Sequence, residues 1–169
     1  ASDNDTRFDP LVHWAAERAA YCINPHELAR RTWDKAAMHT ALINAGLHTP
    51  YTIIVPPYEE HPLPPPVDLS PLGTCFAIKP AHGGGGEGVV MEATSWEQVL
   101  HARQEHPADC YLLQAHIAPT VLDGRPAWFR VIYCTGQVYP CWWEIRTHVY
   151  TPVSSDEERR YGLTPLREV

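Results

Sequence analysis

The stretch that decides the fold is Phe76-Ala-Ile-Lys-Pro-Ala-His-Gly-Gly-Gly-Gly-Glu-Gly-Val-Val-Met91. Five of the chain's ten glycines lie between Gly83 and Gly88, and a short apolar run flanks them on each side. This pattern predicts two strands joined by a glycine-rich loop. Glycine loses the most conformational entropy on ordering, so a glycine cluster favours a site where backbone approaches a ligand. Successive N–H groups beside a lysine, here Lys79, suit a phosphate chain. A flexible surface hairpin is the alternative.

Two other phosphate-binding motifs do not match this stretch. A P-loop has Lys and then Ser or Thr after its last glycine, whereas Val89 follows Gly88 here. A dinucleotide-binding fingerprint opens a helix, whereas the apolar run from Val89 to Met91 favours a strand. The sequence therefore predicts a glycine loop carried on a hairpin.

Composition narrows the class of protein. A chain of 169 residues, 44% apolar and 20% charged, is expected to form one domain or two small lobes. The net charge of −7 disfavours a nucleic-acid partner, and no apolar run approaches the roughly 18 residues of a membrane span. There is no secretory pattern at the start, and the five cysteines form no C-x-x-C pair, so we expect a cytoplasmic protein. The ten histidines form no H-x-H or H-x-x-x-H pair, so no metal site is expected among them.

The pattern of apolar residues in the rest of the sequence predicts an α+β chain. We expect helices over 10–20 and 34–45, a helical turn from Pro25 capped by Asn24, and a helix after a capping box at Thr94–Glu97. Expected strands cover 21–23, 51–55, 109–115, 127–134 and 137–146, the last two joined by a hairpin at Thr135-Gly136. A first helical turn is expected from Thr164 to Val169. The 34–45 helix is expected to bury one apolar face, made of Ala37, Met38, Ala41, Leu42 and Ala45. The proline-rich stretch from Pro56 to Pro71 is expected to be an exposed connection.

Four sequence blocks, which follow one another along the chain, together resemble a known protein family. They are Trp33-Asp-Lys35 through Gly46-Leu-His-Thr-Pro50, Phe76-Ala-Ile-Lys79 to Gly88-Val-Val, Leu112-Leu-Gln-Ala-His-Ile117, and Phe129-Arg-Val-Ile-Tyr133 followed by Gly136-Gln-Val. Together, over about residues 24 to 146, they resemble the ATP-grasp superfamily, in particular its RimK-like and biotin-carboxylase-like carboxylate–amine ligases. The resemblance implies an α+β fold of two small lobes, each an antiparallel sheet with helices. Residues 1–25 would be the remnant of a preceding domain, 26–113 the first lobe with the glycine loop at 82–88, and 114–169 the hinge and an incomplete second lobe.

The resemblance also implies roles for individual residues. Lys35 and Lys79 would contact the phosphates of ATP. The loop would close over them through His82, Gly83, Gly84, Gly85, Gly86 and Gly88, with Glu87 turned outward. At the hinge, the main chain of Ala115 and Ile117 would read the adenine edge, assisted by Gln114 and His116. Arg130 and Arg146 would hold phosphate or a substrate carboxylate, and Trp128, Trp142 and Trp143 would either line an acceptor pocket or belong to the core.

The relative placement of Arg130 and Arg146 depends on the hairpin register. A two-residue turn at Thr135-Gly136 pairs Arg130 with Cys141 and places Arg146 on the opposite face, whereas a three-residue loop brings both arginines to one face. Both registers remain open from the sequence.

One part of the family pattern is missing. ATP-grasp enzymes hold Mg²⁺ through acidic residues near the end of the domain, commonly an acidic residue and then Glu-x-Asn, and nothing after Arg146 has this pattern. The Asp156-Glu-Glu158 run is expected in a charged loop, and metal ligands are expected beyond the end of this chain.

The implied function is that of an ATP-dependent ligase. Such an enzyme forms an acylphosphate from an unidentified carboxylate and ATP and joins it to an amine, and this chain by itself is expected to be inactive. The alternatives are a non-catalytic nucleotide-binding or scaffold domain with the same fold, or a small interaction domain that uses the proline-rich stretch. The oligomeric state stays open.

Overall fold

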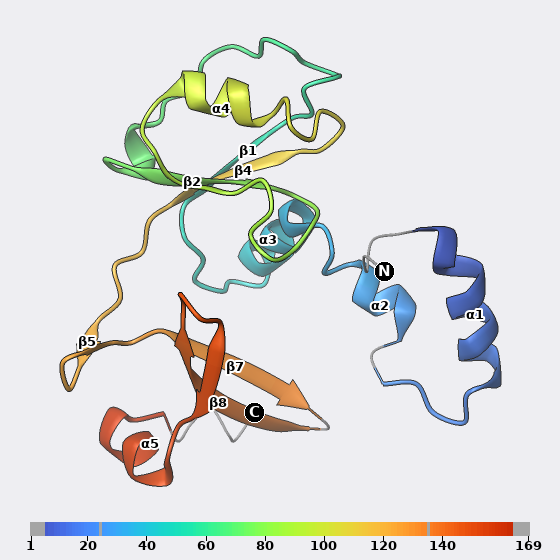
Figure 1. The fold of residues 1–169 in the computed structure, drawn as a ribbon, viewed down its shortest axis with the longest axis vertical. Helices are drawn as coiled ribbons and strands as arrows, with labels where there is room; N and C mark the ends of the chain where they lie inside the picture. The colour runs from blue at the N-terminus through green and yellow to red at the C-terminus, as the bar shows by residue number, and fades with distance from the viewer. Residues whose placement is uncertain (1–5, 24, 135, 164–169) are drawn as a thin grey trace. The chain divides into compact units, whose positions relative to one another are not determined.

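The computed structural model describes residues 6–23, 25–134 and 136–163 (Figure 1). The chain divides into two compact units, Ala1–Ile117 and Ala118–Val169. No helix in the described ranges is long and apolar enough to cross a lipid bilayer. Each unit is described by itself below.

The first unit begins with a short 3₁₀ turn, η1 (Thr6–Phe8), and two helices, α1 (Asp9–Arg18) and α2 (His26–Arg30). Both helices were predicted, although the Asn24 cap lies outside the described residues. The strand predicted over 21–23 is wrong: these residues form an irregular link between α1 and α2. A strand needs a neighbour for its N–H and C=O groups, and this link has none among the described strands.

A four-stranded antiparallel sheet forms the centre of the first unit. Its order is β1 (Thr52–Val55), β4 (Tyr111–Ala115), β2 (Phe76–Pro80) and β3 (Val90–Ala93). These are the strands predicted around 51–55 and 109–115 and on either side of the glycine loop. The loop therefore joins two neighbouring strands, β2 and β3, as a hairpin.

One face of this sheet carries the main core. Its buried members include Phe76 and Ile78 of β2 and Tyr111 and Leu113 of β4, which pack against α4 (Trp96–Ala102) through Val99 and Ala102. The capping box predicted at Thr94–Glu97 lies one residue further along: the Ser95 hydroxyl accepts the Gln98 N–H, and the Gln98 side chain accepts the Ser95 N–H. Ser95 has the extended backbone that is typical of an N-cap (φ −140°, ψ 158°).

Helix α3 (Lys35–Asn44) lies on the other side of the sheet from α4 (Figure 1). The Asp34 carboxylate caps it by accepting the N–H groups of Ala36 and Ala37, and Gly46 follows its end with φ +73°. The predicted apolar face is wrong. The helix buries Ala36 and His39, whereas Leu42 is half-buried and the rest of the expected set is exposed, namely Ala37, Met38, Ala41 and Ala45.

The contacts at the start of α3 explain why a different face of the helix is buried. The Lys35 N–H donates to the carbonyl of Ala81 at 2.9 Å, and Ala36 packs against Ala81 and Leu112. Anchoring at the first turn thus decides which side of the helix meets the sheet, because side chains three and four positions apart share one face.

The proline-rich connection has no helix or strand until the 3₁₀ turn η2 (Ser70–Leu72), as predicted. It is nevertheless tied to the core. The fully buried Arg103 donates to the carbonyl of Pro56 through Nε (3.1 Å) and Nη2 (2.7 Å), and to that of His61 through Nη2 (2.7 Å). Leu69 also packs against the main cluster. The connection is therefore irregular in backbone but held at several points.

The second unit is built on a three-stranded antiparallel sheet of β7 (Phe129–Cys134), β8 (Gln137–Glu144) and β9 (Val149–Pro152). A small hairpin, β5 (Val121–Leu122) with β6 (Arg125–Pro126), precedes it. Cys134 pairs with Gln137, so the β7–β8 turn has two residues and Arg130 lies opposite Cys141. This is the first of the two registers left open by the sequence.

The end of the second unit departs from the prediction. Asp156–Glu158 lies in helix α5 (Ser155–Tyr161), not in a loop, and strand β9 precedes it. A capping box starts α5, since Ser154 Oγ accepts the Glu157 N–H and Glu157 accepts the Ser154 N–H. Trp142 fixes the helix on the sheet by donating from Nε1 to Glu157 Oε1 at 3.1 Å. The helical turn expected over 164–169 lies outside the described residues.

Candidate functional site

The face of the first sheet that α3 covers carries a chain of polar side chains. Lys79 and Gln114 lie on this face of neighbouring strands, because their positions alternate with Ile78 and Leu113, which face the main core. The Lys79 ammonium donates to Gln114 Oε1 at 2.7 Å, and Gln114 Nε2 donates to Thr52 Oγ1 at 3.2 Å. The side chain of Gln114 therefore holds Lys79 in one direction.

Lys35 reaches the same region from the first turn of α3. Its ammonium donates to three carbonyl oxygens where the glycine loop begins, those of Pro80 (3.3 Å), Ala81 (3.1 Å) and Gly83 (2.7 Å). Lys35 and Lys79 are the only two lysines in the sequence. The structure thus brings both lysines and the start of the loop together.

The surroundings of the two ammonium groups lower the pKa of each. Burial lowers the pKa of Lys79, and the nearby positive charge of Lys35 lowers it further. Burial also lowers the pKa of Lys35, although Asp109 and Asp34 partly offset this effect. Among the described residues, no acidic side chain forms an ion pair with Lys79, whose hydrogen-bond partner is the neutral Gln114 amide. An anion bound here would restore the charge balance of both lysines.

The glycine loop needs glycine for its backbone conformation. Gly83, Gly85, Gly86 and Gly88 have φ between +67° and +87°, a region that other residues rarely adopt. A Cβ at any position from 83 to 86 would meet nothing within 4 Å, so this part of the loop is open. Gly88 differs, because a Cβ there would lie 3.0 Å from His106 Nε2.

His82 at the start of the loop is held by Asp109. Its main-chain N–H donates to Asp109 Oδ2 at 2.8 Å, and its Nδ1 lies 2.9 Å from Oδ1. The two residues line a small hollow with His106 and Pro107. Glu87 is exposed, as expected from the sequence.

The predicted hinge follows directly from the sheet. Gln114 and Ala115 end β4, and His116 and Ile117 come after it with exposed side chains. The Ala115 N–H donates to the Tyr51 carbonyl at 2.9 Å. Ile117 is the last residue of the first unit.

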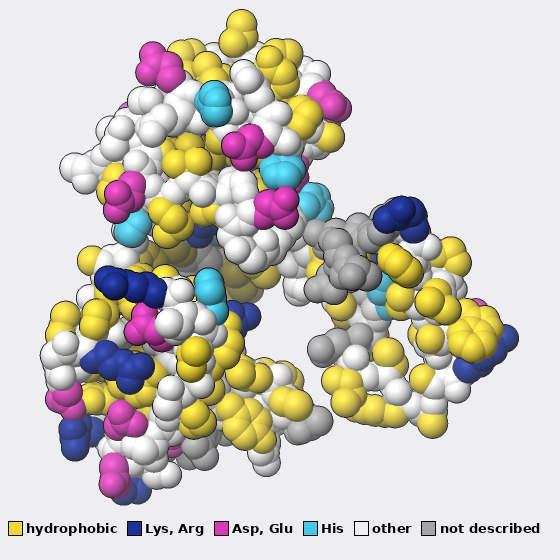
Figure 2. All heavy atoms as spheres, viewed as in Figure 1, with side chains coloured by type: hydrophobic (Ala, Val, Ile, Leu, Met, Phe, Trp, Pro, Cys, Tyr) yellow, Lys and Arg dark blue, Asp and Glu magenta, His cyan; other side chains and the backbone are white. Residues whose placement is uncertain are grey.

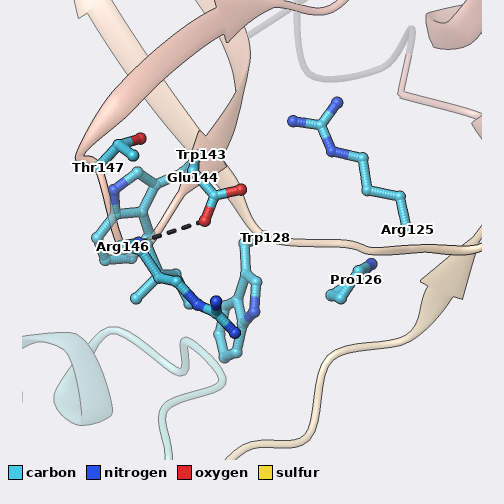
Figure 3. A pocket seen from close by; sticks show the side chains of 8 residues that line it. Arg125, Pro126, Trp128, Trp143, Glu144, Arg146 and Thr147 are labelled. Carbon is cyan, nitrogen blue, oxygen red and sulfur yellow. Dashed lines mark hydrogen bonds between the residues drawn. The ribbon is translucent and has the colours of Figure 1, made fainter.

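The two predicted arginines lie in different parts of the second unit. The Arg130 Nη1 donates to the Tyr150 hydroxyl at 2.7 Å, and its guanidinium lies 5.0 Å from the centre of the Tyr150 ring. Arg146 lies beyond the end of β8 and lines a pocket of about 550 Å³ together with Arg125, Trp128, Trp143 and Glu144 (Figure 3). Figure 3 shows that Arg125 and Arg146 come to this pocket from separate segments.

The three tryptophans divide between pocket and core. Trp128 and Trp143 line the pocket, whereas Trp142 is buried between Phe129 (ring centres 4.5 Å apart) and Tyr161 (5.9 Å). The Arg125 guanidinium covers Trp142 at 4.2 Å. Sequence reasoning missed Arg125, because no local pattern marks it as a pocket residue.

Comparison with known proteins gives one kind of match. No family model matches the sequence, and no curated protein matches it. Among solved structures, the chain is similar to D-cycloserine synthetase DcsG, with a TM-score of 0.62 and 17% sequence identity over 95% of this chain and 58% of that one. The chain thus spans little more than half the length of that protein. At this identity the likeness concerns the fold, and it agrees with the antiparallel sheets and helices described above: the chain has an α+β fold of the ATP-grasp type.

Proposed function

We propose that this chain is the ATP-binding portion of an ATP-dependent ligase that joins a carboxylate to an amine or similar nucleophile. The observation that carries the proposal is the pair of lysines at the base of the glycine loop. Both have lowered pKa values, and Lys79 has no acidic partner among the described residues. The ATP-grasp fold supports it, because the similar structure is that of a synthetase.

In this proposal the triphosphate of ATP, bound with Mg²⁺, lies against Lys35 and Lys79. The open glycines Gly83 to Gly86, with Gly88, supply the main-chain N–H groups of a lid, and His82 lies at its base. Charged phosphate oxygens accept stronger hydrogen bonds than neutral carbonyls do. The Lys35 ammonium would therefore exchange its loop carbonyls for phosphate, which frees the loop to fold over the nucleotide.

The adenine would be read at the end of β4. Because the Ala115 N–H already donates to Tyr51, we assign the N–H donor to Ile117 and the acceptor to the Ala115 carbonyl. Gln114 would act by holding Lys79, and the exposed His116 would lie beside the base.

Arg130 and Arg146 would bind the remaining negative charge. Arg130 is held by Tyr150, which leaves its other guanidinium N–H groups to donate to phosphate. Arg146 and Arg125, beside two tryptophans, suit a substrate carboxylate with an apolar body. The substrate carboxylate would attack the γ-phosphorus with loss of ADP, and the amine would then displace phosphate from the acylphosphate. We assign no Mg²⁺ ligands within this chain.

The presence of only two lysines makes the proposal testable by chemical labelling. A lowered pKa gives more neutral amine at a given pH, so both lysines should react readily with an amine-directed acetylating reagent, as read by peptide mass spectrometry. Mg-ATP should protect both, and the N-terminal amine serves as the internal unprotected control. Equal labelling with and without millimolar Mg-ATP would refute nucleotide binding at this site.

Titration calorimetry on single-residue variants tests which cations contribute to ATP binding. Lys79→Met should weaken ATP binding by about 10- to 100-fold, the effect of losing one charged hydrogen bond. Arg31→Met removes an exposed cation elsewhere and should leave the affinity unchanged. In a full-length enzyme, ATP binding without ADP formation in the presence of carboxylates and amines would favour the non-catalytic alternative.

A further inference from the structure

Three side chains that commonly bind metals come together in the N-terminal segment, away from the lysine pair. His13 lies in α1, and His26 and Glu27 begin α2. One ligand atom of each lies within 4.8 Å of those of the other two, and His13 Nε2 is 3.7 Å from Glu27 Oε1. Within the described ranges this is the only such group of His, Cys, Asp and Glu side chains. We propose that His13, His26 and Glu27 form a binding site for a divalent transition-metal ion, best fitted by Zn²⁺.

The distances are close to those that Zn²⁺ requires. With bonds of about 2.0–2.1 Å in tetrahedral geometry, neighbouring ligand atoms lie about 3.3 Å apart. The separation of 3.7 Å between His13 and Glu27 is near this value, and their side chains are 54% and 70% exposed. Because more than half of each side chain is exposed, both can adjust to an ion by small rotations.

His26 is the fixed member of the group. Its side chain is only 11% exposed, and its ring packs edge-on against Trp33, with the ring centres 5.6 Å apart. Its Nε2 is buried and has no hydrogen-bond partner among the described residues. Buried polar atoms are normally satisfied, so an orphaned imidazole nitrogen beside two other ligands points to a missing partner.

Asp9 lies beside the same ring nitrogen. Its Oδ1 lies 3.6 Å from His26 Nε2, beyond hydrogen-bond distance, and its Oδ2 accepts from Arg30 Nη1 at 2.9 Å. The negative charge of this carboxylate beside the ring favours a bound cation.

The ligand set selects the class of ion. Two imidazoles and one carboxylate suit Zn²⁺ and its transition-metal neighbours, whereas Mg²⁺ and Ca²⁺ prefer oxygen ligands. The ion is thus distinct from the Mg²⁺ that accompanies ATP. Neither α1 nor α2 has a buried residue, so the two helices gain little from packing. A metal ion that binds both would cross-link them.

Calorimetric titration of the metal-free chain with ZnCl₂ at pH 7.5 tests the proposal. We expect one ion per chain, a Co²⁺ complex with the intense visible bands of tetrahedral coordination, and no competition from equimolar Mg²⁺. His13→Ala and Glu27→Gln should each weaken Zn²⁺ binding by about 10-fold or more. Both side chains are exposed, so these variants should keep the circular dichroism of the parent.

The matched control is the double variant His48→Ala/His101→Ala, which removes two exposed histidines from other elements. It should bind Zn²⁺ as the parent does. The proposal is overturned if His13→Ala and Glu27→Gln bind Zn²⁺ as tightly as the parent, if the control loses as much affinity as they do, or if Co²⁺ retains the spectrum of the free ion.

Discussion

Replacing Gly88 by alanine should destabilise the first unit, whereas the same change at Gly84 should not. Gly88 has φ +67°, where an alanine costs about 1–2 kcal/mol. Its Cβ would also lie 3.0 Å from His106 Nε2 and 3.3 Å from Pro80 Cγ, which adds about 1 kcal/mol even if the His106 ring turns aside. The expected loss in the free energy of unfolding is therefore about 2–3 kcal/mol.

Gly84 provides the matched control within the same loop. It is outside the left-handed region, and a Cβ there would meet nothing within 4 Å. Alanine at this position restricts the unfolded chain, so it should be neutral or stabilise by up to about 1 kcal/mol.

Thermal unfolding followed by circular dichroism measures both variants. For a chain of this size, a loss of 2–3 kcal/mol lowers the melting temperature by roughly 4–12 °C. In a His106→Ala background, Gly88→Ala should cost about 1 kcal/mol less, because the contact is gone and only backbone strain remains. Equal melting temperatures for Gly84→Ala and Gly88→Ala would refute the reasoning.

Three further predictions concern the buried cation, the C-terminal helix and the lysine pair. Arg103→Met should cost about 2–4 kcal/mol of unfolding free energy, because the carbonyls of Pro56 and His61 lose their donor; a melting temperature equal to that of the parent would contradict this. Ser154→Ala should cost about 1 kcal/mol through loss of the α5 cap, whereas Ser155→Ala, one position later, should cost much less; equal effects in urea unfolding would argue against the cap. ATP binding should take up protons in the alkaline range below pH 10.5, since phosphate raises the lowered pKa of both lysines; calorimetry in buffers of different ionisation enthalpy would show this, and proton release would contradict it.

The parts of the fold that the sequence predicted correctly depend on residues close together in the chain. The strand–glycine–strand stretch, the helix predicted over 34–45 and the hairpin between the strands predicted over 127–134 and 137–146 each depend on residues within a few positions of one another. Their physical causes are local backbone preference and capping, which a sequence displays directly.

The failures arise where a distant contact overrides a local pattern. The exposed face of α3 looks apolar in sequence, but the bond from Lys35 N–H to the Ala81 carbonyl turns Ala36 and His39 inward. The run Ser155–Tyr161 looks like a solvated loop because it is highly charged, yet the Ser154 capping box and the bond between Trp142 and Glu157 hold it as a helix. The capping box was visible in the sequence as Ser-x-x-Glu, whereas the hydrogen bond between Trp142 and Glu157 was not.

The candidate sites also divide into features that are local in the sequence and features that depend on distant contacts. The sequence placed Lys35 at the start of a helix and Lys79 towards the end of a strand, and the structure has them there. His13 and the His26-Glu27 pair have no diagnostic spacing, since they come from two helices joined by an irregular link, and only the packing of α2 beside α1 brings them together. Arg125 reaches the pocket of Arg146 through the small β5–β6 hairpin, whose two short strands were not predicted from the sequence.

Lys35 shows why a correct position still leaves its role to be tested. In this structure its ammonium is fully occupied by the carbonyls of Pro80, Ala81 and Gly83, which explains a lysine at a helix start without any ligand. Lys79 has one neutral partner, so loop anchoring does not explain it. If both lysines only anchored the glycine loop, nothing would offset the repulsion between their two positive charges. This repulsion is the reason why we propose that a negative group, the phosphate chain of ATP, binds beside both lysines.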